Sequence, residues 1–403
     1  MKISPFSTSG NKGREWAEIA SGMIHNQLLD KTHAATSGEL RVGGCSVLYF
    51  IYLSIMTDLL PCGHKIFDQL RLASDPFVAI SDASHILEHL EFTSEETIKS
   101  ESTAGRFVSL HSRRLYAECR LLHSLLELRD PDLNDTIEQR WEQAVARLDM
   151  AIIVVGAPGE GRLDLILDTI DIIQAEHLPM RGNIRYLTIS SKSEMPFVNF
   201  EDLAFNHIPR ISPPSVSTFQ RTSSSPFILP GFINDWPALT DHSWNSPAYL
   251  LRIAGRGRVV PVEVGTDYRA DDWNQKILPW EDFLRGIGLT LDSNENEGDE
   301  LGFQTDNTGK EVLYLAQHTL FTQFPSLRSD IIVPDYVYSS PSPPSSFPSY
   351  RPPGNDDQLV INAWLGPKGT LSPAHTVWVP GLVAFHVNNK AFSGIGSILQ
   401  LLW

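Results

Sequence analysis

The stretch that decides the fold lies toward the end of the sequence and reads Leu359-Val-Ile-Asn-Ala-Trp364-Leu-Gly-Pro-Lys-Gly-Thr-Leu-Ser372-Pro-Ala-His375-Thr376. It joins a short apolar run to a segment of glycine, proline and hydroxyl residues. From about residue 195 onwards, glycine, proline and serine separate short runs rich in valine, isoleucine and aromatic side chains. This spacing predicts an antiparallel β-domain with irregular loops. The proline- and serine-rich residues 339–354 are expected to form an exposed loop, because proline has no N–H to donate to a sheet.

The residues before about 178 follow a different pattern. Their apolar residues recur at helical spacing, and short polar breaks separate the segments, most clearly Arg113–Arg129, Asp135–Val155 and Leu163–Glu176. The most apolar window, Cys45–Met56, is too short to cross a bilayer and is interpreted as a buried helix. The sequence therefore predicts an α+β chain, with an all-helical domain over residues 1–195 followed by the β-domain.

Composition limits the kind of protein this can be. The 403 residues carry a formal net charge of −16, which argues against a nucleic-acid binder that works by bulk electrostatics. The first ten residues contain no apolar stretch of the length that a secretory signal needs. The three cysteines match no metal-binding spacing and indicate a reducing compartment. We expect a nuclear or cytoplasmic protein that is neither secreted nor bound to a membrane.

Four further motifs precede the stretch at 359–376 in a consistent order. They are Phe232-Ile-Asn-Asp-Trp-Pro-Ala238, Arg258-Val-Val-Pro-Val-Glu-Val-Gly265, Tyr314-Leu-Ala-Gln-His318 and Asp330-Ile-Ile-Val-Pro-Asp-Tyr336. Together the five motifs closely resemble the jumonji-C (JmjC) family over about residues 207–376. Five motifs in order are far more specific than one short pattern.

The resemblance implies an oxygenase that depends on Fe(II) and 2-oxoglutarate, built on a double-stranded β-helix of the cupin type. In that family a His-x-Asp pair and a later histidine hold the iron and leave its opposite face open. His375 matches the first metal ligand, Tyr314 and Ser372 match residues that bind 2-oxoglutarate, and Trp364 lies on the substrate side. Without the resemblance, Tyr314 would be interpreted as a core tyrosine, Ser372 as a turn hydroxyl and Trp364 as a packed tryptophan.

The sequence departs from the family directly after Thr376. The family continues with aspartate, whereas this chain has Val377, whose side chain offers no lone pair to a metal. We expect two of the three iron ligands to be missing, the jelly roll to be incomplete and the chain to be inactive as an oxygenase. The β-domain is then residues 196–376, and residues 377–403 form a tail unrelated to the family, expected to be poorly ordered or irregularly paired. Because Val-Trp is encoded GTN-TGG and introns commonly begin with GT, one hypothesis is that this tail is a translated intron.

Three functions are compatible with the sequence. The resemblance implies a protein side-chain hydroxylase or a histone lysine demethylase, and an acidic chain suits a basic protein or peptide substrate of the histone or ribosomal type. A catalytically dead binding or scaffold protein is the literal interpretation of the residues present. A cupin-like hydroxylase of a small molecule is the third.

Three other patterns imitate functional motifs. Residues 150–163 resemble a phosphate-binding loop, but Arg162 and Leu163 replace the lysine and hydroxyl that it needs, so a glycine-rich turn between two helices is predicted. The sequence His85-Ile-Leu-Glu88-His89 fits a zinc-protease pattern but is expected to be a helix surface. The acidic run 292–300 lacks calcium-loop spacing and is predicted to be a solvated hairpin tip.

Overall fold

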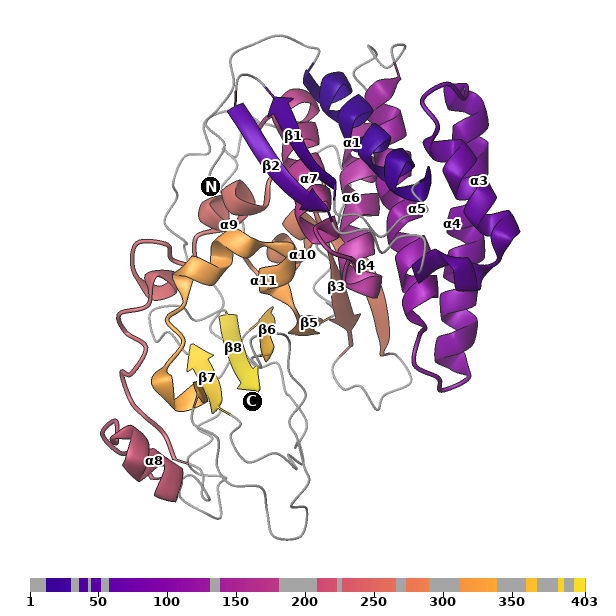
Figure 1. Cartoon of the computed structure of the whole chain (residues 1–403). Coiled ribbons are helices and arrows are strands. Elements are labelled where there is room, and N and C mark those ends of the chain that lie inside the picture. Colours follow the sequence, from indigo (N-terminus) through magenta and orange to yellow (C-terminus); the bar gives the residue numbers. More distant parts are fainter. Residues whose placement is uncertain are drawn as a thin grey trace. The chain divides into compact units, whose positions relative to one another are not determined.

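The computed structural model describes residues 12–29, 36–42, 45–51, 58–130, 138–180, 209–222, 227–265, 273–289, 312–338, 360–367, 383–387 and 395–402 (Figure 1). The chain divides into two compact units. The helical unit is Met1–Met180 together with Gly255–Val259, and the sheet unit is Arg181–Ala254 together with Val260–Trp403. Within the described ranges, no helix has both the length and the apolar character that a membrane crossing requires.

The helical unit is built around α5 (Leu110–Arg129). This helix packs against α1 (Lys12–Leu29), α4 (Ile80–Thr103) and α6 (Glu138–Val155). It buries residues on all its sides, as expected of a central helix. The short η1 (Leu60–Cys62), α3 (His64–Ser74) and α7 (Arg162–His177) complete the helical elements of this unit. The three helices predicted over 113–176 are confirmed as α5, α6 and α7.

The helix predicted over Cys45–Met56 is wrong. Residues Cys45–Ile51 form strand β2, which pairs with β1 (Thr36–Val42) in an antiparallel hairpin that matches Val42 with Cys45. The window is rich in β-branched and aromatic residues, which favour strands. Two glycines, Gly43 and Gly44, separate the strands in the sequence, and a two-residue Gly-Gly connection is a hairpin signal. The helical domain is therefore not purely helical.

The turn between α6 and α7 confirms that residues 150–163 do not form a phosphate-binding loop. Gly156, Gly159 and Gly161 all have positive φ angles. A Cβ atom at Gly159 would lie 1.1 Å from Nη1 of Arg114, which donates a hydrogen bond of 2.9 Å to the carbonyl of Pro158. The space that a phosphate would need is therefore occupied by a buried guanidinium group.

The sheet unit contains a six-stranded sheet in the order β4-β3-β5-β6-β8-β7. The strands are β3 (Val259–Val264), β4 (Asn274–Pro279), β5 (Leu313–His318), β6 (Val360–Pro367), β7 (Val383–Val387) and β8 (Ile395–Leu402). The pairs β3–β5, β5–β6, β6–β8 and β7–β8 are antiparallel. The predicted α+β fold class is confirmed, and the sheet is consistent with an incomplete jelly roll.

Short helices accompany the sheet. They are α8 (Val216–Thr222), η3 (Pro237–Leu239), α9 (Pro247–Ala254), α10 (Trp280–Gly286), α11 (Leu320–Gln323), η4 (Pro325–Asp330) and η5 (Asp335–Tyr338). One apolar core joins most of these helices, though not α8, to the strands, with Val262, Phe283 and Leu315 among its buried members. This core supports one face of β3, β5 and β6.

Part of the segment after residue 376 joins the sheet. Strand β8 pairs with β6 along its whole length, from Val360–Leu402 to Pro367–Ile395, and β7 pairs with β8. Residues 383–387 and 395–402 of the predicted tail are therefore strands of this sheet. The predicted loop 339–354, the acidic run 292–300 and the predicted domain boundary at residue 195 lie outside the described residues.

Candidate functional site

Two of the predicted site residues, Tyr314 and Trp364, lie on adjacent strands. The register pairs Leu315 of β5 with Leu365 of β6, and both leucines belong to the apolar core. Because side chains alternate along a strand, Tyr314 and Trp364 occupy the other face of these two strands. The structure therefore brings these two residues to one face of the sheet, and the roles of both stay predictions.

The same face carries two polar residues that sequence analysis did not select. Glu263 of β3 is the direct partner of Tyr314, so their side chains share a face. Asn362 lies two residues before Trp364 on β6 and is buried, with 5% of its surface exposed. The alternating pattern of β3 could have placed Glu263 on a polar face, but no sequence signal identifies its partner strand.

Trp364 is itself largely buried, with 8% of its surface exposed, whereas Tyr314 is half-buried. The Cα atom of Trp364 lies opposite that of Ile398 in β8, so this tryptophan is in the interior of the sheet. Both the substrate-side role and the packed-tryptophan interpretation are compatible with this position.

The other two predicted residues, Ser372 and His375, lie outside the described residues. Within the described ranges, no group of three histidine, cysteine, aspartate or glutamate side chains could hold a metal ion. In the sequence, Val377 supplies no ligand atom at the position that follows Thr376. Among the described residues, therefore, no donor set that could hold ferrous iron is complete.

A buried carboxylate at the start of the motif 330–336 joins that motif to residues 242–249. Asp330, which has no exposed surface, accepts hydrogen bonds from Nδ1 of His242 at 2.7 Å, Nε1 of Trp244 at 2.9 Å and the Tyr249 hydroxyl at 2.7 Å. Burial and then the Asp330 carboxylate raise the pKa of the Tyr249 hydroxyl. Three hydrogen bonds to one buried carboxylate anchor the chain at this point. Each of the three donor groups is already bound to Asp330.

The motif that begins with Tyr314 also ends in a fixed side chain. A bulge separates Leu315 from His318, and His318 is buried with Nε2 2.7 Å from Oε1 of Gln323 in α11. This bond ties the end of β5 to the helix that follows. Nε2 of His318 is therefore bound to Gln323 and is not available as a metal ligand.

A serine, a histidine and a glutamate also meet in the helical unit. Ser109 Oγ lies 3.1 Å from Nε2 of His111 and 3.1 Å from Oε1 of Glu101. In a hydrolytic triad the carboxylate orients the histidine, but here Glu101 binds the serine, and Ser109 caps α5 by accepting from the N–H of Ser112. Burial raises the pKa of the neighbouring Cys62 thiol to about 11. This cluster is a helix cap and not a nucleophilic site.

The zinc-like pattern is confirmed as a helix surface. His85, Glu88 and His89 are exposed on α4, and His85 Nδ1 lies 3.6 Å from Glu88 Oε2 within the same helix.

Comparison with known proteins confirms the resemblance to the JmjC family. The chain is 37% identical over 171 residues to Jumonji C domain-containing protein 5 of Drosophila melanogaster, which covers 42% of this chain and 36% of that protein. It is 37% identical over 171 residues to lysine-specific demethylase 8 of Danio rerio, with 42% and 35% covered. It is 34% identical over 176 residues to lysine-specific demethylase JMJ30 of Arabidopsis thaliana, with 44% and 34% covered. The chain thus matches about a third of the length of these relatives, and no protein-family model matches it.

Proposed function

We propose that residues 196–376 are a JmjC-type domain of the Fe(II)- and 2-oxoglutarate-dependent oxygenases, and that this chain is inactive as an oxygenase because Val377 replaces a metal ligand. The five ordered motifs and the identity to proteins named as JmjC proteins and demethylases support the class. The placement of Tyr314 and Trp364 on one face of β5 and β6 supports the proposed site. The valine at position 377 supports the inactivity.

The proposed roles follow the resemblance. His375 would contact iron, Tyr314 and Ser372 would bind the carboxylate of 2-oxoglutarate, and Trp364 would contact the substrate. When bound, iron and 2-oxoglutarate supply oxidation of a C–H bond in this class. An acidic chain of net charge −16 favours a basic protein or peptide as the substrate of an active relative, because complementary charge speeds encounter.

A second candidate function is that of a binding protein that retains the JmjC fold without its chemistry. It rests on the same valine, since a domain without its aspartate ligand keeps its surface and its substrate-side tryptophan. Both proposals predict that the chain forms no succinate, whereas the small-molecule hydroxylase predicts turnover of 2-oxoglutarate.

The test measures metal binding and succinate formation by the full 403-residue chain. Anaerobic titration with Fe(II) is followed by metal analysis after gel filtration, and succinate is measured in the presence of 2-oxoglutarate and oxygen. We expect neither stoichiometric iron nor succinate. Iron retained at one equivalent, lost in His375→Ala and accompanied by succinate, would show that the chain is an active oxygenase. Binding of 2-oxoglutarate alone, weakened by Tyr314→Phe, would support the proposed cofactor face.

A further inference from the structure

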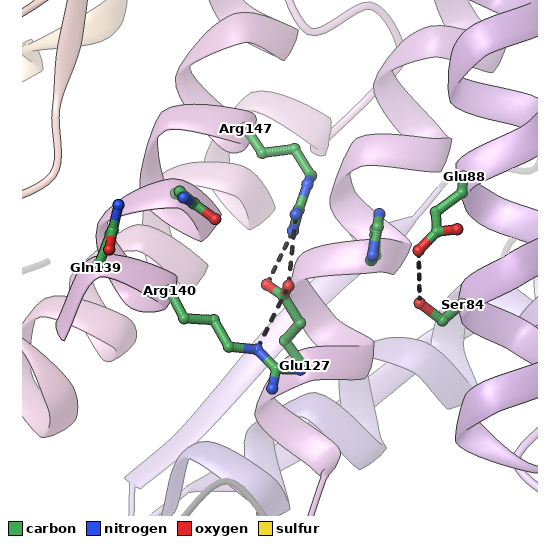
Figure 2. Close-up of a pocket in the computed structure, with 8 residues that line it drawn as sticks. Ser84, Glu88, Glu127, Gln139, Arg140 and Arg147 are labelled. Atoms are coloured by element: carbon green, nitrogen blue, oxygen red, sulfur yellow. Dashed lines mark hydrogen bonds and ion pairs between the residues drawn. The ribbon is translucent and has the colours of Figure 1, made fainter. Parts of the chain in front are cut away.

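A groove of about 420 Å³ in the helical unit belongs to no site described above. It runs between α4 and α6 over α5 and is open to solvent (Figure 2). Ser84 and Glu88 of α4 form one wall, His123 and Glu127 of α5 form the floor, and Arg140 and Arg147 stand on α6. All of these residues are polar, so the groove selects ligands by charge and hydrogen bonding.

The charged side chains on the floor of the groove are already paired within the helical unit. Arg147 donates to both carboxylate oxygens of Glu127, at 2.8 and 3.4 Å, and His123 Nδ1 lies 2.9 Å from Glu91 Oε1. Figure 2 shows Arg147 reaching down onto Glu127. These internal pairs hold the three helices together and leave the floor nearly neutral.

The wall formed by α6 carries N–H groups that can still donate hydrogen bonds. The guanidinium group of Arg140 forms ion pairs with Glu127 Oε1 at 3.7 Å and Asp130 Oδ2 at 3.8 Å, but both distances are too long for hydrogen bonds, and its side chain is 39% exposed. Gln139 and Gln143, also on this wall, are exposed, and their amides have no hydrogen-bond partner in the part of the chain that the structure describes. This wall therefore offers to an incoming group the N–H donors of Arg140, which is paired with its carboxylates only at long distance, and two amides.

The wall formed by α4 has the opposite charge. Glu88 is 58% exposed and interacts weakly with its own helix, through Ser84 Oγ at 3.5 Å and His85 Nδ1 at 3.6 Å. Figure 2 shows Glu88 facing the groove from the side opposite to Arg140. The groove thus has a cationic wall and an anionic wall with a neutral floor between them.

We propose that this groove binds a peptide segment that carries an acidic side chain close to a basic one, with the acid on Arg140 and the base on Glu88. The glutamine amides can pair with the N–H and C=O groups of an extended peptide backbone. Pockets for small molecules are mostly enclosed and apolar, and this groove is neither. A purely acidic peptide would meet Glu88, and a purely basic one would meet Arg140, so only a mixed-charge segment satisfies both walls.

The test uses synthetic heptapeptides that place glutamate and lysine two or three residues apart, in both orders, titrated calorimetrically into the full chain. Control peptides replace glutamate, lysine or both by glutamine. We expect the best mixed-charge peptide to bind about two- to fivefold more tightly than each peptide that lacks one charge, since one exposed charge pair contributes up to about fivefold. Equal affinity for the fully neutral peptide, or free glutamate and lysine competing as well as the peptide does, would overturn the proposal.

Charge reversal provides the discriminating variants. Arg140→Glu should change the preference to a peptide with two lysines, and Glu88→Lys should change it to a peptide with two glutamates. Arg106→Glu and Glu160→Lys make the same net charge changes at exposed positions outside the groove and should keep the original preference. A variant that merely unfolds loses all binding, so a changed ranking of peptides reports the groove itself. An unchanged ranking in both groove variants would contradict the proposal.

Discussion

Arg258 and Asp149 form a buried, two-pronged ion pair between residues that are 109 positions apart in the sequence. Nε of Arg258 lies 3.0 and 2.9 Å from the two oxygens of Asp149, and Nη2 lies 2.8 Å from Oδ1. The backbone N–H of Val259 donates to the same carboxylate at 2.9 Å. One aspartate of α6 therefore holds the segment Gly255–Val259, which continues along the chain into β3, within the helical unit.

Removing this carboxylate should destabilise the helical unit strongly. In Asp149→Ala, the buried guanidinium of Arg258 and the N–H of Val259 lose their acceptor, and breaking one side of a buried pair costs about 3–5 kcal/mol. Urea denaturation followed by circular dichroism measures the change. Lys99→Gln, which removes an exposed ion pair on α4, is the control and should leave the midpoint near that of the wild type. A similar small effect in both variants would show that the buried pair contributes little.

Gly159 should be the least replaceable residue of the glycine-rich turn. Gly159→Ala combines an unfavourable φ of +110° with a collision against Arg114, whose guanidinium is fixed by Pro158 and Glu118. We expect a loss of about 3 kcal/mol in the free energy of unfolding. Gly105→Ala has a positive φ of +66° but open space around its Cβ, and should cost about 1 kcal/mol. Equal losses in the two variants would mean that Arg114 moves aside freely.

Ionisation of Glu91 should make the free energy of unfolding of the helical unit depend on pH. Burial raises the pKa of its carboxyl, but the hydrogen bond with His123 and the charges of His123, Arg147 and Arg120 outweigh burial and lower the pKa below 4.5. A carboxyl with a lowered pKa in the folded state stabilises the fold above the unfolded value of 4.5, and this stabilisation is lost as the pH falls through the folded value.

The measurement compares the free energy of unfolding of the wild type and Glu91→Gln between pH 7 and pH 3. The difference should be largest above about pH 5 and should shrink as the pH falls below the unfolded pKa. Glu96→Gln, on the exposed side of α4, should show no such narrowing. A difference that stays constant across the range would exclude an ionised Glu91 as its cause.

Val377→Asp should raise the affinity of the chain for divalent metal, because it restores a carboxylate two residues after His375. Co(II) is a suitable probe, since its visible absorption reports coordination without turnover. We expect at least about a tenfold gain over the wild type, and Val377→Asn, which has the same size without the charge, should give little. If His375→Ala in the Val377→Asp background keeps the gain, the metal is bound elsewhere.

The hypothesis that residues 377–403 are a translated intron is tested separately, by sequencing cDNA across codon 376. A dominant transcript that removes the stretch and continues with an aspartate codon is expected. A dominant transcript that retains it would refute the hypothesis.

Local patterns were sufficient for much of this fold. Helical spacing located α5, α6 and α7, the missing lysine and hydroxyl at Arg162 and Leu163 excluded a phosphate-binding loop, and five ordered motifs identified the JmjC-like domain. These features depend on residues within a turn or a strand of one another, so the order of side chains is enough to reveal them. The window at Cys45 shows the limit, because an apolar run of that length suits either a buried helix or a strand, and pairing with β1 decided between them.

The contacts between residues far apart in the sequence were decided only by the folded chain. Tyr314 meets Glu263, Asp330 collects donors from His242, Trp244 and Tyr249, and Arg258 reaches Asp149, all across separations of about 50 to 110 residues. No spacing rule in a single sequence predicts such pairs, since they depend on which strands and helices become neighbours after the apolar residues are buried. Packing selects those neighbours, and the polar groups are then paired because leaving them unpaired in the interior would cost too much free energy.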